Sequence, residues 1–234
     1  MVLLFQMHYF DLYNANNQKK NSMGRVKDGA FGGFSGKVGN VVGASWRDID
    51  YIRSLPTRVN DPKTKKQLKQ RSRLTVAMNF LGTITPFLRI GFQSQANGRM
   101  TAFNAAMSYN MKFAVKEGDQ GVGLVYPNVL VSLGSLSNAS NVHAEVMEGE
   151  LRVNWETNAE GNAWSDDMAM LVAHDPAKGV SVYDLNAGKR TNKKAGLPLP
   201  PAWKGDMIET YLAFKTADGT VVSDSFYTGR YLVC

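Results

Sequence analysis

The chain has 234 residues, of which 44% are hydrophobic, and a formal net charge of +7. Its single cysteine, Cys234, excludes an internal disulfide framework, so an oxidising compartment is not needed. No stretch approaches the roughly 18 apolar residues of a membrane-spanning helix, and the three histidines lack metal-ligand spacing. We expect one large domain or two small ones, with no cofactor, no metal site and no small-molecule ligand.

Charge is distributed unevenly along the chain. Residues 24–118 carry a net charge of +11, whereas residues 119–234 carry −5. This asymmetry predicts two regions with different surfaces, 23–118 and 119–234. It also allows the acidic half of one copy to pair with the basic half of a neighbour, in a homo-oligomer or a larger protein assembly.

Residues 1–22 differ in pattern from the rest of the chain. They have a short apolar opening and then a polar run, without the basic, apolar and small-residue regions of a secretory signal. We expect them to form a loosely attached extension upstream of a natural start at Met23. With neither a signal nor a membrane span, the predicted localisation is cytoplasmic or particle-associated.

The next segment is rich in glycine and has the pattern of strands. Residues 38–46 and 49–55 predict a β-hairpin with a tight turn at residues 47–48. Gly32–Lys37 is not a phosphate loop, because valine follows the lysine where the Walker pattern has Ser or Thr. An exposed, glycine-rich hairpin edge is suited to subunit pairing.

A basic helix comes after the hairpin. Thr64 and Gln67 fit a capping box and predict a helix over residues 65–81. Thr85 and Pro86 are expected to be the N-cap and first position of a second helix. The first turn carries cations although the helix dipole favours anions there. This departure from a local rule indicates an anionic partner, and a solvated charged face is the alternative. The candidate anionic-partner residues are Lys63, Lys65, Lys66, Lys69, Arg71 and Arg73.

Apolar residues at helical spacing occur in this helix and in the next. We expect the face opposite the cations to be buried, and we expect another helix over residues 98–118, ended by a glycine-rich linker. Methionine and phenylalanine form a stripe on that later helix, which is more typical of core than of a ligand groove. The two sets are Leu74, Ala77, Met78 and Leu81, and then Met100, Phe103, Met107, Met111 and Ala114.

Residues 124–234 contain short segments with the alternating pattern of strands, separated by turn signals. They predict an antiparallel β-sandwich resembling immunoglobulin or fibronectin type III domains, with Trp155 in its core. The basic loop at residues 189–194 is expected to be solvated, and residues 197–201 are expected to form an extended connection. The fold class is therefore α+β, with an N-terminal hairpin and helices before the sandwich. The strands are expected at 125–133, 142–147, 151–156, 168–174, 180–185, 208–215 and 225–233.

Catalytic motifs are scarce. The nearest to a metal or acid/base site is the group Asp166, Asp167, His174 and Asp175, but carboxylates in a turn usually serve the turn itself. There is no Ser/His/Asp order, Cys/His pair or glycosidase-like carboxylate couple. We predict that the protein is not an enzyme.

Several motifs in the first half of the chain carry a resemblance. They are Met23–Arg25, Gly32–Gly39, Val41–Trp46, Ile49–Pro56 and Thr85–Phe92. This pattern resembles the bacterial family catalogued as Domain of Unknown Function 6266, over roughly residue 23 to the C-terminus. The family brings no established activity, so the resemblance implies no functional residue, although its start supports the extension at residues 1–22.

Two classes of function remain. The first is a non-enzymatic structural or assembly protein that self-assembles or docks on a larger particle. The segment from Asn60 to Arg71 supports it by resembling a pattern in phage-encoded structural proteins, although Asp61 interrupts the usual Asn-Pro pair. The second is a nucleic-acid-binding protein that uses the basic helix at residues 63–73, which lacks the interleaved aromatic residues that favour single strands.

Overall fold

A computed structural model describes residues 25–26, 33–46, 49–55, 61–97, 100–118, 121–156 and 161–234. The expected extension at residues 1–22 and the expected turn at residues 47–48 lie outside these ranges. The chain divides into two compact units, Met1–Pro62 and Lys63–Cys234. We expected divisions after residue 22 and after residue 118, so the observed division differs from the expectation.

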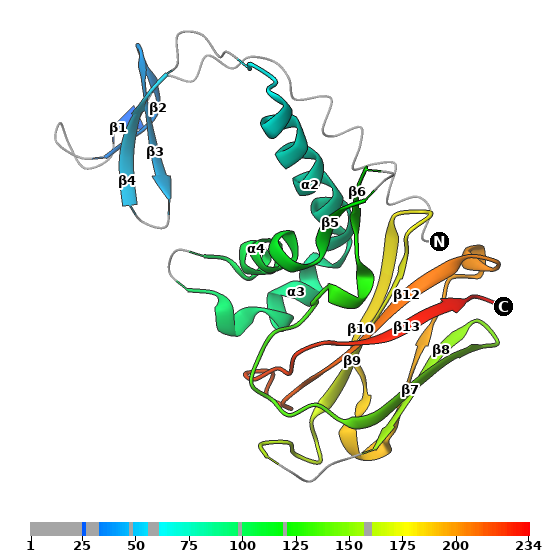
Figure 1. Cartoon of the computed structure of the whole chain (residues 1–234). Coiled ribbons are helices and arrows are strands. Elements are labelled where there is room, and N and C mark those ends of the chain that lie inside the picture. The colour runs from blue at the N-terminus through cyan, green and yellow to red at the C-terminus, as the bar shows by residue number, and fades with distance from the viewer. Residues whose placement is uncertain are drawn as a thin grey trace. The chain divides into compact units, whose positions relative to one another are not determined.

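The first unit contains a four-stranded antiparallel sheet, which we call the N-terminal sheet (Figure 1). Its strands are β1 (Arg25–Val26), β2 (Phe34–Val38), β3 (Val41–Trp46) and β4 (Ile49–Ser54), paired in that order. The expected strand over residues 38–46 is divided by a turn at Gly39 and Asn40. Gly39 has a φ of 59°, in the left-handed region that glycine enters readily, so the chain reverses there.

Glycine at position 43 permits a close crossing within this sheet. A Cβ at Gly43 would lie 2.0 Å from the Phe34 carbonyl oxygen and 2.6 Å from the Phe34 ring. Gly43 is the one buried residue among the described positions of this sheet. The start of β2 therefore folds over β3 at a point where only glycine leaves room.

The second unit begins with the predicted basic helix. Helix α2 (Lys65–Leu81) has the expected capping box: the Thr64 hydroxyl accepts from the Gln67 amide (3.3 Å), and the Gln67 side chain accepts from the Thr64 amide (3.1 Å). A 3₁₀ turn, η1 (Gly82–Ile84), leads directly into α3 (Thr85–Gly91). The second helix was expected to be capped by Thr85, but Ile84 occupies the cap position.

Helix α4 (Ala102–Phe113) is shorter than the range of 98–118 that we expected. The residues expected to link it to the sandwich instead form a two-stranded sheet of β5 (Val115–Gly118) and β6 (Gly121–Leu124). Gly121, the first residue of β6, has a φ of 110°, a backbone conformation that glycine adopts readily. Glycines that suggested a flexible linker therefore shape a hairpin.

Two antiparallel sheets complete the second unit. One has the order β10-β9-β12-β13 and the other β11-β8-β7. The sequence did not predict β11, which was expected to be a basic loop and an extended connection. The strands are β7 (Ser140–Met147), β8 (Glu150–Glu156), β9 (Met168–Asp175), β10 (Val180–Lys189), β11 (Lys194–Pro198), β12 (Met207–Lys215) and β13 (Phe226–Leu232).

The expected strand at residues 125–133 is a 3₁₀ turn, η3 (Tyr126–Asn128), continued by an irregular segment. The buried side chain of Asn110 on α4 replaces a neighbouring strand there. Its amide donates to the Leu130 carbonyl (2.8 Å), and its oxygen accepts from the Leu130 amide (3.0 Å). A side chain therefore satisfies backbone groups that would otherwise require a sheet ladder.

The four-stranded sheet of β10, β9, β12 and β13 is the middle layer of the second unit (Figure 1). One core lies between the two sheets and includes Leu151, Trp155, Leu171 and Phe214. The other lies between the four-stranded sheet and the helices, where Phe80, Phe87 and Ala106 join Met170, Val172 and Tyr211. Because the sheet shares a core with the helices, the second unit includes both, and no boundary falls at residue 118.

Candidate functional site

The six predicted anion-binding residues do not form one free basic face. Lys63, Lys65, Lys66, Lys69 and Arg71 are exposed, and Arg73 is partly buried. Lys69 forms an ion pair with Glu117 on β5. Arg73 donates from Nη2 to the Met111 carbonyl near the end of α4 (2.6 Å).

These two contacts change the interpretation of the helix. Lys69 and Arg73 fix α2 against β5 and α4, and the arginine also neutralises part of the negative end of the α4 dipole. Among the described residues, neither Lys65 nor Lys66 has an ion-pair partner. The candidate surface is therefore smaller than the sequence suggested and is centred on the first turn of α2.

The apolar half of α2 is only partly buried. Ala77 and Leu81 are fully buried, as predicted, but Leu74 is 46% and Met78 43% exposed. Leu74 instead lines an open groove of about 490 Å³ between α2 and α4, together with Met107 and Met111. Of the stripe expected on the later helix, Met107 on α4 and Ala114 just after it are buried, whereas Met100, which precedes α4, is exposed, so that stripe is also only partly core.

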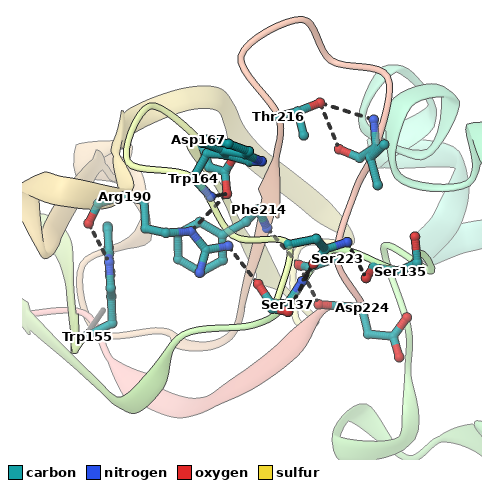
Figure 2. Close-up of polar contacts among 12 residues, drawn as sticks. Ser135, Ser137, Trp155, Trp164, Asp167, Arg190, Phe214, Thr216, Ser223 and Asp224 are labelled. Atoms are coloured by element: carbon teal, nitrogen blue, oxygen red, sulfur yellow. Dashed lines mark hydrogen bonds and ion pairs between the residues drawn. The ribbon is translucent and has the colours of Figure 1, made fainter. Parts of the chain in front are cut away.

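A buried ion pair lies in the sandwich where a solvated loop was expected (Figure 2). Arg190 is 2% exposed, and its Nε contacts Oδ2 of the fully buried Asp167 at 3.1 Å. Its guanidinium also donates to the Ser137 carbonyl (2.7 Å) and lies 4.0 Å from the centre of the Phe214 ring. Burial lowers the pKa of Arg190, and Asp167 opposes that change.

This pair links segments that are distant in sequence. The Arg190 carbonyl accepts from the indole of Trp155 (3.0 Å), and Asp167 Oδ2 accepts from the Trp164 amide (2.9 Å). Asp167 Oδ1 and Arg190 Nη1 are buried without a hydrogen-bond partner. Asp167 and Arg190 are 23 positions apart, so no local pattern in the sequence could have indicated this contact.

A hydrogen-bonded histidine lies where the helices meet the four-stranded sheet. His174 Nδ1 is 2.9 Å from the Ser181 hydroxyl, which is 2.6 Å from the Thr83 hydroxyl. The ring of Phe80 packs edge-on against the imidazole, with centroids 4.6 Å apart. Burial lowers the pKa of His174 to about 4, and a hydrogen bond with Val180 partly opposes it. The neutral imidazole thus joins α2 and η1 to the sheet.

The residues Asp166, Asp167, His174 and Asp175 are not gathered into one site. Asp167 is paired with Arg190, and His174 contacts Ser181. Asp175 accepts from two backbone amides of the adjoining turn, at 2.8 and 3.1 Å. In the described ranges, no group of three or more histidine, cysteine or acidic residues is arranged to hold a metal ion.

The N-terminal sheet exposes large apolar side chains. Ile49 is 63%, Ile52 64%, Tyr51 44% and Val38 51% exposed. Neither hydrophobic core includes any residue of this sheet, as far as the chain is described. Single exposed apolar residues are ordinary, whereas a group of them on one small sheet is unusual.

Facing pairs divide these residues between the two faces of the sheet. Tyr51 lies opposite Ala44 and Arg53 opposite Val42, so these four residues share one face with Ile49. Ile52 lies opposite Gly43 on the other face, where Phe34 crosses. The first face is apolar with Arg53 beside it, whereas the second combines Ile52 with the polar residues Asp50 and Ser54.

The chain belongs to the Family of unknown function (DUF6266), whose model matches residues 33–229. The match begins ten residues after the Met23 start that the sequence motifs suggested. No curated protein and no solved structure matches the chain. No helix within the described residues is long and apolar enough to cross a membrane.

Proposed function

We propose that this protein is a non-enzymatic structural protein that assembles with further copies of itself through the N-terminal sheet. The observation that carries the proposal is the exposure of Ile49, Tyr51 and Ile52 on a sheet that lacks a core among the described residues. Exposed apolar groups of this size lose contact with water when a partner covers them, at about 25 cal/mol per Å² buried. Assembly is therefore the state in which this sheet is stable.

The sandwich is the outward module in this proposal, and we infer that it is of the immunoglobulin or fibronectin type III kind. Seven antiparallel strands in two facing sheets and a core tryptophan on β8 support this assignment. The strand β10 pairs with β9 rather than with β11, so three strands face four. In the constant-type immunoglobulin arrangement the four-stranded sheet is the other one.

Light scattering coupled to size exclusion tests the assembly. The wild-type chain should elute as an oligomer, and the double variant Ile49→Ser, Tyr51→Ser should shift toward monomer. The matched control is Leu74→Ser, which removes an apolar group of similar exposure from α2 and should not change the mass. A monomeric wild-type chain across micromolar concentrations would contradict the proposal.

The second candidate is a nucleic-acid-binding protein, and one observation favours it. The first turn of α2 contains Lys65 and Lys66 and no acidic residue. The two cations attract phosphate groups. They also lie at the positive end of the helix dipole, which disfavours cations. Running the same size-exclusion experiment with duplex DNA or RNA separates this candidate from self-assembly.

A further inference from the structure

We propose that β4 is a homotypic interface, in which the β4 strands of two copies pair antiparallel about a two-fold axis with Ile52 opposite Ile52 of the second copy. This inference rests on the proposed assembly function and specifies its contact. It makes one continuous sheet from two N-terminal sheets, and β3 and β4 of each copy keep their own pairing.

The outer edge of β4 has backbone groups available for this pairing. Among the described residues, β4 is the last strand in the sheet order and pairs on one side only, with β3. The Leu55 amide donates to the Asn40 carbonyl at 2.7 Å, which identifies these two residues as a hydrogen-bonded pair. Because such pairs alternate along an antiparallel ladder, the backbone groups of Asp50, Ile52 and Ser54 point away from β3.

Some of the usual protections of an edge strand are missing from β4, although Asp50 and Arg53 are charged. It pairs with β3 over six residues in one continuous register, so no bulge bends the edge away. Its sequence, Ile-Asp-Tyr-Ile-Arg-Ser, contains neither proline nor lysine. Natural sheets normally use such devices to prevent pairing between edges. Without a bulge or a proline, the outer edge of β4 is able to pair with another strand.

Symmetry restricts the register of two β4 strands. A two-fold axis perpendicular to the sheet keeps each face continuous, so one residue must lie opposite its own copy. Centring on Asp50 or on Arg53 places like charges opposite each other, which is destabilising. Centring on Tyr51 places the Asp50 carboxylate opposite Ile52.

Centring on Ile52 gives every side chain a compatible neighbour. Tyr51 then lies opposite Arg53 of the second copy, where a guanidinium and an aromatic ring attract each other. Asp50 lies opposite Ser54, whose hydroxyl can donate to the carboxylate. The residues with outward backbone groups also face each other in this register. The strand is thus complementary to itself, which identifies the partner as a second copy.

Cysteine cross-linking tests the register. In a Cys234→Ser background, which removes the native thiol, Ile52→Cys places two thiols on a facing pair with Cα atoms about 5.5 Å apart. This distance suits a disulfide. Mild oxidation of dilute protein should convert most of that variant to a covalent dimer. Tyr51→Cys and Ser45→Cys, on β4 and on the inner strand β3, should stay largely monomeric on denaturing gels.

Each outcome supports or contradicts the proposed pairing of β4 strands. A covalent dimer for Ile52→Cys alone supports the proposed register, whereas a dimer for Tyr51→Cys alone overturns it. If light scattering shows oligomers but neither β4 variant cross-links, the interface lies elsewhere and only this inference fails. If the wild-type chain is monomeric, the inference and the proposed function both fail.

Discussion

The N-terminal sheet and the unit from Lys63 to Cys234 use similar apolar strands in opposite ways. On β9, Met170, Leu171 and Val172 are fully buried because a core covers each face of the sheet. On β4, Ile49 and Ile52 are more than 60% exposed. The apolar composition of a strand therefore does not determine whether its side chains are buried. The layers that pack against the sheet determine it. The larger unit should be stable by itself, whereas the sheet should depend on a partner.

The largest expected effect is a loss of stability in the unit from Lys63 to Cys234. Asp167→Ala leaves the Arg190 guanidinium buried without its counter-charge, which should reduce the free energy of unfolding by about 3–5 kcal/mol. Denaturation by urea measures the loss. Arg152→Met, which removes solvent-accessible ion pairs with Glu148 and Glu150, is the matched control and should change stability little. Equal, small effects of both variants would show that the buried pair is not required.

A pH titration tests the same unit through His174. Its pKa is lowered from 6.5 to about 4 in the folded chain, so the unfolded chain takes up a proton first as pH falls. Stability should therefore decrease between about pH 7 and pH 4, by about 3 kcal/mol in total. His174→Gln should flatten this dependence, and His143→Gln, on β7, should preserve it. An unchanged slope for His174→Gln would assign the effect to other groups.

The sequence predicted local features better than it predicted contacts between distant residues. The helix from Lys65 to Leu81 and its capping box were predicted correctly, because Thr64 and Gln67 are three positions apart and act on each other's backbone. Alternation predicted most of the sandwich strands, although the segment at residues 125–133 is not a strand because Asn110 satisfies its backbone.

The candidate site shows the same limit. Six cations could be counted in the sequence, but the contacts of Lys69 with Glu117 and of Arg73 with Met111 join residues 48 and 38 positions apart. The burial of Arg190 likewise depends on Asp167 and Phe214, which lie on other segments. Periodicity identifies the face of a helix, but it does not identify the element that will pack against that face.

A single methyl group should disrupt the N-terminal sheet without affecting the larger unit. In Gly43→Ala, the added Cβ would overlap the Phe34 carbonyl oxygen, so β2 must shift, at a cost of about 1–3 kcal/mol. Hydrogen exchange of the β2–β4 amides should accelerate and oligomers should dissociate, while the main unfolding transition keeps its midpoint. Gly82→Ala is the control, because a Cβ there meets nothing within 4 Å. Unchanged exchange in Gly43→Ala would show that the crossing can relax.

The smallest expected effect concerns the basic helix and separates the two functions. If Lys65 and Lys66 neutralise phosphates, affinity for duplex DNA falls with salt because counterions are released. Changing both to glutamine should then reduce the log–log slope by about 1.8, since each contact contributes about 0.9. Lys69 and Arg73 are left intact because they hold α2 against β5 and α4.

The matched control for this pair is the double variant Lys189→Gln, Lys194→Gln, which removes two exposed cations from the acidic half of the chain. It should leave the slope unchanged if binding is local to α2. A wild-type chain without salt-dependent binding would eliminate the nucleic-acid candidate. If the Lys65 and Lys66 changes instead weaken the oligomer, the first turn of α2 contacts acidic protein surface. Assembly would then use charge on α2 in addition to the apolar sheet.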